Sequence, residues 1–225
     1  MKSEPIYENN ELYTAFPEPD EVFYSEVEKE RFLPLGTFHL QTDEGQHDVL
    51  IAAPIGDDEG MIGKNNYGEF CGETWLTYSK VNGKWKLDCS PDQLLDFSIC
   101  FDEVDCIFKK LKRIFQLNGF LSHPLKEEVK SPESEKISLF SLMSYMSHGY
   151  NCSYDVVKYF KYVLEGVDEQ KLEPPFKEDK EIKYMDSNYN EYVFLGCAGA
   201  NALIHEMFFF YNVVTKRVLV VNEFD

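Results

Sequence analysis

The C-terminal stretch from Tyr192 to Phe224 constrains the fold of this chain more than any other. It reads YVFLGCAGANALIHEMFFFYNVVTKRVLVVNEF and is rich in the β-branched and aromatic residues that favour strands. Gly196 and Gly199 interrupt it once, and the polar run from Asn212 to Arg217 interrupts it again. We therefore predict a buried antiparallel meander on which most of the chain packs. Its expected strands are Tyr192–Leu195, Leu203–Tyr211 and Val218–Val221.

The rest of the chain mixes strand and helix patterns. Asn82–Gly83 is the pair favoured in a type I′ turn, and it predicts a hairpin of Thr74–Lys80 with Lys84–Leu87. Apolar residues at helical spacing predict a helix over Glu103–Leu117. Further strands are expected at Phe32–Leu40 and Asp48–Pro54, and further helices at Pro19–Phe32, Ser131–His148 and Ser153–Leu164.

These patterns predict the α+β class, with antiparallel sheets built from hairpins and with helices packed on them. A chain of 225 residues is long enough to bury one large core. Residues 121–136 are polar and hold two prolines, which is typical of a linker. We expect one domain over residues 1–225, with the alternative of two lobes (1–120 and 137–225) joined by residues 121–136.

The charge of the chain bears on its partners. Acidic residues number 40 and basic residues 22, which gives a formal charge of −18. A nucleic-acid backbone would be repelled, so we expect no nucleic-acid partner. The one basic cluster, Lys109–Arg113, falls on a helix where the dipole explains it. The acidity serves solubility, or it forms a surface that docks onto a basic protein.

Compartment and cofactors are constrained mainly by what the sequence lacks. The six cysteines form no C-x-x-C pair and show no zinc-like spacing, so we expect no metal and thiols in a reducing cytoplasm. No apolar run approaches the roughly 20 residues of a membrane span, and no apolar leader follows Met1. The common nucleotide-binding and esterase motifs are missing, so we expect no cofactor.

Two groups of carboxylates are the candidate binding residues. The first lies in a loop, residues 55–73, that contains five glycines and is long enough to carry a function. The second lies at the start of the helix expected over Glu103–Leu117, where the helix dipole alone would also explain it. The candidate residues are Asp57, Asp58, Glu59, Asp102, Glu103 and Asp105.

We assign no catalytic residue. Cys197, in the turn-like Gly196–Gly199, would need a nearby histidine to become a nucleophile, and His123, His148 or His205 could supply one only if folding brings it close. The pair His205–Glu206 lacks the second histidine of a zinc protease, because position 209 is Phe. A buried thiol and a strand histidine remain the simpler interpretations.

The C-terminal stretch also resembles the end of bacterial immunity proteins of the Smi1/Knr4 (SUKH) type. The resemblance is an apolar strand, a small-residue turn, an aromatic strand and a polar turn before a valine-rich strand. It lies at Phe194–Gly196, Phe208–Tyr211 and Thr215–Val218. It implies an α+β protein that binds and neutralises a toxin and has no catalytic residues.

These observations lead to one main hypothesis and two alternatives. The main one is a cytoplasmic binding module of the immunity or inhibitor kind that neutralises a basic protein partner, with a toxin as the candidate. One alternative is a hydrolase with the 55–73 loop over its cleft, in which Cys197 or loop carboxylates act. The other is an adaptor without a discrete site.

Overall fold

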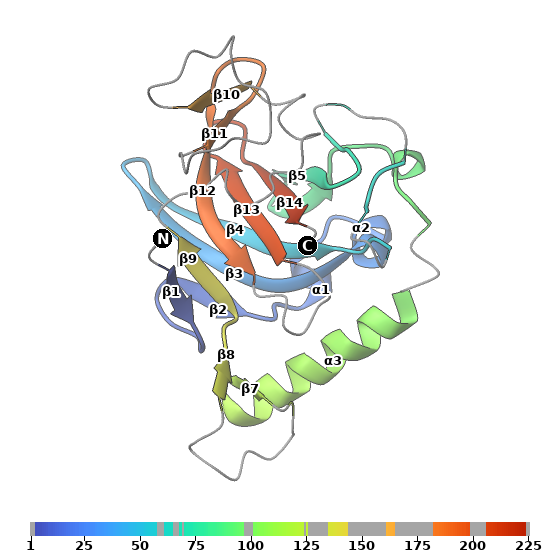
Figure 1. Cartoon of the computed structure of the whole chain (residues 1–225), viewed down its shortest axis with the longest axis vertical. Coiled ribbons are helices and arrows are strands. Elements are labelled where there is room, and N and C mark those ends of the chain that lie inside the picture. The colour runs from blue at the N-terminus through green and yellow to red at the C-terminus, as the bar shows by residue number, and fades with distance from the viewer. Residues whose placement is uncertain are drawn as a thin grey trace.

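A computed structural model shows how the chain folds (Figure 1). It describes residues 3–57, 61–64, 68, 70–96, 101–123, 125, 135–143, 161–164, 182–198 and 206–223. The helices are α1 (Pro19–Val22), α2 (Glu26–Arg31) and α3 (Phe101–Asn118), with a 3₁₀ turn η1 (Pro91–Gln93). The strands of the first half are β1 (Ser3–Ile6), β2 (Tyr13–Ala15), β3 (Phe32–Thr42), β4 (Gly45–Pro54), β5 (Trp75–Val81), β6 (Lys84–Leu87) and β7 (Leu121–His123). Those of the second half are β8 (Glu135–Ile137), β9 (Phe140–Met143), β10 (Lys161–Leu164), β11 (Ile182–Met185), β12 (Glu191–Ala198), β13 (Glu206–Asn212) and β14 (Arg217–Glu223).

A large antiparallel sheet forms the main layer, in the order β1-β9-β12-β13-β14-β5-β6, with β11 beside β12 and β10 beside β11. Its middle strands β12, β13 and β14 are the predicted meander. The sequence prediction of an α+β fold with antiparallel sheets and hairpins is therefore confirmed. Strands from both halves of the sequence meet in this sheet, since β1 pairs with β9 and β5 pairs with β14.

A second sheet, β2-β3-β4, lies across the large one (Figure 1). β4 packs against β13 and β14. Between the layers the Phe140 ring stacks on Tyr13 at 5.5 Å and contacts Phe38 at 5.6 Å. The buried hydroxyl of Tyr78 on β5 donates to the Leu50 carbonyl at 2.7 Å. The core thus lies between two sheets, and its aromatic side chains come from many strands.

The helix α3 closes one end of this core. Its buried face carries Phe108 and Phe115, whose rings contact Phe16 at 5.8 and 5.4 Å. Gly119, with a φ of +78°, ends the helix, as the Asn118–Gly119 pair predicts. β7 and β8 then form a two-stranded ribbon beside it. Most of the stretch between those strands, residues 126–134, lies outside the described residues.

Two turns show why particular residues are needed. Asn82 and Gly83 both have positive φ, +52° and +84°, so the β5–β6 hairpin has the backbone of the predicted type I′ turn. Gly196 has a φ of +140° at a register shift of β12. A Cβ there would lie 2.1 Å from the Ser141 carbonyl oxygen, so the pairing of β12 with β9 depends on glycine.

The prediction of a helix over Ser131–His148 is wrong for the residues that the structure describes. β8 and β9 lie there instead, and β9 pairs with both β1 and β12. Ile137 and Phe140 are spaced as on a helix, but each is buried as part of a strand, because sheet pairing overrides the local pattern. The helix predicted over Ser153–Leu164 likewise ends in a strand, β10, and its earlier residues lie outside the described part.

In place of the single helix predicted over Pro19–Phe32, the structure has two short helices, α1 and α2. Between them Phe23 forms a bridge with Trp85 of β6, which requires an extended backbone. Among the described residues, none of the helices combines the length and the apolar character needed to cross a membrane.

Candidate functional site

The predicted carboxylates on α3 occupy the first turn of that helix. Asp102 and Glu103 are exposed, and Asp105 is partly buried. Asp105 forms an ion pair with Lys109 one turn later, at 2.5 Å. The ion pair holds the pKa of Lys109 above its ordinary value. The dipole and Lys109 thus give these carboxylates a structural role.

The predicted loop site is described only in part. Asp57 closes a turn, since its carboxylate and its N–H both bond to the backbone of Met61, at 2.9 and 3.0 Å. Asp58 and Glu59 lie outside the described residues. The following segment, 61–64, is fixed to the 3₁₀ turn by a hydrogen bond from Lys64 N–H to the Gln93 carbonyl. Gly63 and Gly72 are needed there for packing, because a Cβ on Gly63 would lie 2.3 Å from the Gly72 oxygen.

A different acidic surface stands out, and the local sequence explains how it forms. Residues 18–31 hold six acidic and two basic residues. Pro19 begins α1, where a missing N–H costs nothing. Ser25 precedes α2, and the Glu28 carboxylate accepts from the Ser25 N–H at 2.9 Å and from its hydroxyl at 2.6 Å. This reciprocal cap fixes where α2 starts.

The segment is anchored on the exposed edge of β6. The Tyr24 N–H donates to the Trp85 carbonyl at 2.9 Å, and Phe23 is buried against Phe32 at 5.9 Å. The Leu87 N–H donates to the second carboxylate oxygen of Glu28 at 3.1 Å. Glu28 is only 3% exposed, so a buried carboxylate ties α2 to the sheet. Its charge is stabilised by three hydrogen bonds rather than by water.

With Phe23 and Glu28 facing inward, the residues between them face solvent. Tyr24 is 44% exposed and Val27 is 37% exposed, so both are large apolar side chains in contact with water. The ammonium of Lys86 lies 5.2 Å from the centre of the Tyr24 ring. We define the α1–α2 surface as these two side chains and the exposed carboxylates around them: Glu18, Asp20, Glu21, Glu26 and Glu30.

Part of the charge on the α1–α2 surface is neutralised within the protein. Lys29 forms ion pairs with Asp20 and Glu26, and its hydrogen bond holds the pKa of Asp20 below the usual range. Lys112 of α3 forms an ion pair with Glu18 at 2.8 Å. Glu21 and Glu30 form no ion pair with a described residue. Lys84 also lies there, 2.8 Å from the Asp20 carbonyl, so among the described residues the carboxylates that stay without an ion pair beside the exposed apolar side chains are Glu21 and Glu30.

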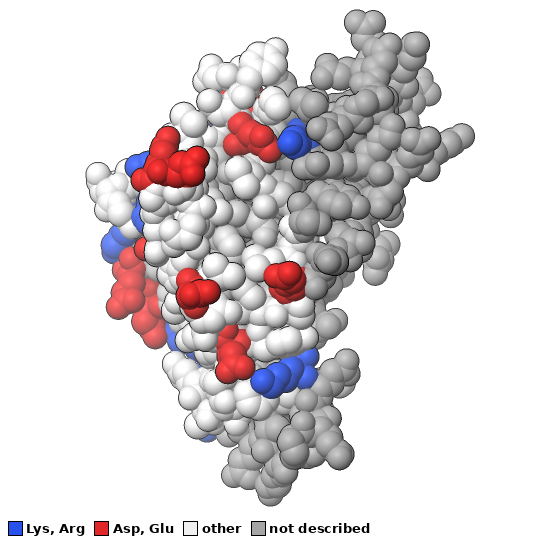
Figure 2. Space-filling view, turned by 90° about the vertical axis from the view of Figure 1, so that its left-hand side faces the viewer, with Lys and Arg blue, Asp and Glu red and all other residues white. Residues whose placement is uncertain are grey.

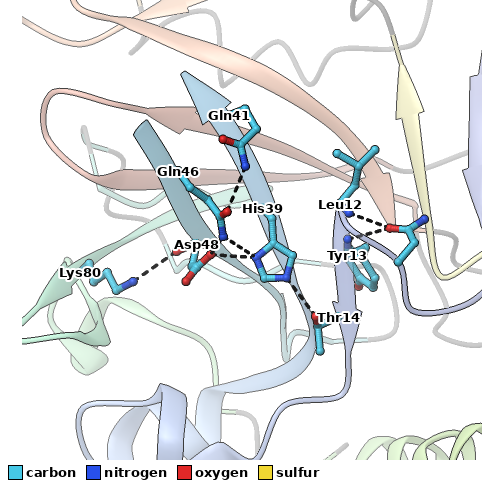
Figure 3. A network of polar contacts seen from close by, with 9 residues as sticks. Leu12, Tyr13, Thr14, His39, Gln41, Gln46, Asp48 and Lys80 are labelled. Carbon is cyan, nitrogen blue, oxygen red and sulfur yellow. Dashed lines mark hydrogen bonds and ion pairs between the residues drawn. The ribbon is translucent and has the colours of Figure 1, made fainter. Parts of the chain in front are cut away.

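A hydroxyl, an imidazole and a carboxylate align on the outer face of the second sheet (Figure 3). His39 is 3.0 Å from the Thr14 hydroxyl through Nε2 and 2.8 Å from Asp48 through Nδ1. This is the order of groups in a nucleophilic triad. Hydrogen bonds from Gln46 and His39 hold the pKa of Asp48 below its usual value.

Strand pairing accounts for this alignment. His39 and Asp48 are direct partners in the β3–β4 register, Gln41 and Gln46 are the next such pair, and Thr14 lies on the neighbouring strand β2. Thr14 and Asp48 are exposed on an open sheet face, whereas a triad acts in a site that excludes water. We interpret the network as a cross-strand ladder that stabilises the sheet.

Cys197 lies on β12 and is buried. Burial and the neighbouring Glu206 carboxylate raise the pKa of its thiol to about 12, so the sulfur stays protonated and poorly nucleophilic at neutral pH. His123 is exposed on β7, and His148 and His205 lie outside the described residues. The geometry therefore gives Cys197 the character of a buried structural thiol.

Acidic groups also occur elsewhere on the molecule. On the face that Figure 2 shows, carboxylates lie in separate groups divided by uncharged surface, with fewer basic groups between them. A high total charge thus does not by itself locate a binding site. No family model, curated protein or solved structure matches this chain.

The candidate loop and α3 carboxylates were found in the sequence by their charge, but the α1–α2 surface was not. Its signal was present, since Tyr24 and Val27 stand within an acidic run. A helix over Pro19–Phe32 would turn Val27 toward the core, because it shares the spacing of Phe23. Val27 faces solvent because the helix is interrupted at Phe23 and Tyr24.

Proposed function

We propose that this protein is an acidic protein-binding module that neutralises a basic protein partner, in the manner of an immunity protein or inhibitor. The observation that carries the proposal is the α1–α2 surface, where carboxylates surround exposed Tyr24 and Val27. Interfaces commonly combine an aromatic anchor at the centre with a charged rim. A basic partner would meet that rim favourably and be guided to it at long range.

The anchoring of the surface supports a binding role. The Glu28 carboxylate and the Trp85 carbonyl hold Tyr24 and the start of α2 on β6 through backbone hydrogen bonds. An anchor side chain on a fixed backbone loses less conformational freedom when it binds. The resemblance of the C-terminal meander to SUKH-type immunity proteins is consistent with this proposal.

The proposal predicts where a partner contacts the chain. A photoreactive phenylalanine analogue replaces Tyr24 in one variant and Leu117 of α3 in a control, since Leu117 is also exposed, at 60%. After irradiation in the cells from which the chain comes, the Tyr24 variant should cross-link to a basic protein that the Leu117 variant does not capture. The captured protein is then purified for binding measurements.

Binding by the captured protein should depend on salt and on the acidic rim. We expect its affinity to fall with rising salt, and the double variant Glu21→Lys/Glu30→Lys to slow association about tenfold or more at low salt. The control Asp102→Lys/Glu103→Lys changes the charge equally on α3. If the control weakens binding more than the double variant does, the sequence-predicted acids form the interface. Affinity insensitive to salt and to both variants would contradict the proposal.

The hydrolase alternative receives no comparable support from the described residues. Cys197 is held as a protonated thiol, and the Thr14–His39–Asp48 alignment is explained by strand pairing.

A further inference from the structure

Two cysteines distant in sequence meet at the edge of β5, beyond the end of β6. Thr77 on β5 accepts a hydrogen bond from Asp88 N–H at 3.2 Å and donates its own N–H to the Phe70 carbonyl at 2.9 Å. The residues that follow Phe70 and Asp88 are Cys71 and Cys89. Cys71 also forms a β-bridge with Leu76. The backbone of β5 thus brings both cysteines to the same place.

The two side chains interact directly. The Cys89 thiol donates a hydrogen bond to the Cys71 sulfur, and neither cysteine is in a disulfide. The hydrogen bond lowers the pKa of Cys71, whereas it raises the pKa of Cys89 together with burial. Cys71 is 2% and Cys89 8% exposed. The hydrogen bond favours the thiolate form of Cys71, and the pairing of both segments with β5 keeps Cys89 beside it.

We propose that Cys71 and Cys89 are a redox-active dithiol that a hydroperoxide converts to a disulfide. The Cys71 thiolate attacks the terminal oxygen of the peroxide, the O–O bond breaks, and a sulfenic acid forms. The leaving group is hydroxide from hydrogen peroxide or an alkoxide from an organic hydroperoxide. The Cys89 sulfur then attacks the Cys71 sulfur, the S–O bond breaks, and water leaves with the proton of the Cys89 thiol. Two electrons pass from the thiols to the peroxide, and a dithiol reductant reverses the change.

The surroundings hold both cysteines in place. Asp88, next to Cys89, accepts from Arg217 at 2.9 Å and from Ser79 at 2.5 Å, and the Arg217 guanidinium lies 4.6 Å from the Phe70 ring. A single charged cluster therefore fixes the residue before each cysteine. A disulfide formed here would link two segments that are already fixed together.

Gly63, in segment 61–64, packs on Cys71 and limits how fast an oxidant reaches its sulfur. Gly63 packs on it so closely that a Cβ would lie 3.4 Å from the Cys71 sulfur. We expect a hydroperoxide, which is small, to reach Cys71 when segment 61–64 opens locally. We therefore expect oxidation to be slower than that of the exposed Cys106, but to give a disulfide instead of higher oxidation states.

The test uses the full chain, hydrogen peroxide and mass spectrometry. After oxidation, the remaining thiols are alkylated and the protein is digested without reduction by trypsin and an aspartate-directed protease. The second protease separates Cys89 from Cys100 and Cys106, because Asp92 and Asp96 lie between them. We expect a Cys71–Cys89 cross-linked peptide that dithiothreitol removes. The melting temperature should rise by roughly 5–10 °C, since the bond closes the loop of residues 72–88.

Matched variants make the result specific. Cys197→Ser should keep the cross-link, whereas Cys89→Ser should leave a Cys71 sulfenic acid that dimedone traps. Recovery of Cys71 and Cys89 as thiols when peroxide treatment continues long after Cys106 is fully oxidised would overturn the proposal. So would disulfides only to other cysteines, or a cross-link that lowers the melting temperature, which would mean that the bond forms in an opened chain.

Discussion

The α1–α2 surface and the first turn of α3 are both acidic, yet they differ in what surrounds their carboxylates. On α3, Asp102, Glu103 and Asp105 lie at a helix N-terminus, and Lys109 pairs with Asp105. On the α1–α2 surface the carboxylates surround exposed Tyr24 and Val27 above a buried anchor. Acidic residues are therefore better candidates for a binding surface when apolar side chains are exposed beside them. At a helix N-terminus, the helix dipole accounts for acidic residues without a binding partner.

The largest expected effect is on stability, which a variant of the α1–α2 surface should lower more than a variant of α3. Glu28→Ala removes the carboxylate that accepts three hydrogen bonds, and it leaves the buried Leu87 N–H without an acceptor. The free energy of unfolding should therefore fall by about 3 kcal/mol. Glu103→Ala on α3 removes an exposed dipole partner and should cost less than about 1 kcal/mol. Urea unfolding of both variants measures the difference. Equal losses would mean that Glu28 is not the anchor of α2.

The next effect concerns affinity for the cross-linked partner. Tyr24→Ala should weaken binding about tenfold or more, because a central aromatic anchor contributes more than the residues around it. Leu117→Ala removes an exposed apolar side chain from α3 and should leave affinity unchanged. Titration calorimetry at fixed salt tests both. A larger loss from the Leu117 variant would move the interface to α3.

The smallest expected effect is a gain, because one substitution should speed association with the partner. Lys29→Gln removes the cation that pairs with Asp20 and Glu26, so the pKa of Asp20 returns toward its usual value and the surface gains net negative charge. We expect association with the basic partner to become about twofold to fivefold faster at low salt, and the gain to vanish at high salt. Lys109→Gln on α3, measured by stopped flow, is the control. Slower binding by Lys29→Gln would show that Lys29 itself contacts the partner.

Local chemistry made some of the structure predictable. The turn chemistry of Asn82–Gly83 and the strand residues after Tyr192 were sufficient to place the β5–β6 hairpin and the meander. The helical spacing from Val104 to Phe115 was sufficient to place α3. In each case the pattern that specifies the element lies within the element.

Other elements depended on residues far away in sequence. Phe140 lies in a strand because β1 and β12 pair on either side of β9, and neither partner is visible in the local pattern. The helix expected over Pro19–Phe32 breaks because Trp85 of β6 pairs with Phe23. A local pattern cannot show which partner a backbone group will find.

By itself, the sequence determined the α+β class, the acidity, the C-terminal meander and the hairpin, because composition, period and turn residues are local properties. Only the tertiary structure decided which acidic residues share a surface with exposed apolar side chains. It also decided that Cys71 and Cys89 meet beside Thr77, and that a triad-like alignment is a ladder between strands. The physical reason is the same throughout: strands and buried groups find their partners across long stretches of chain, and only those partners determine which side chains meet.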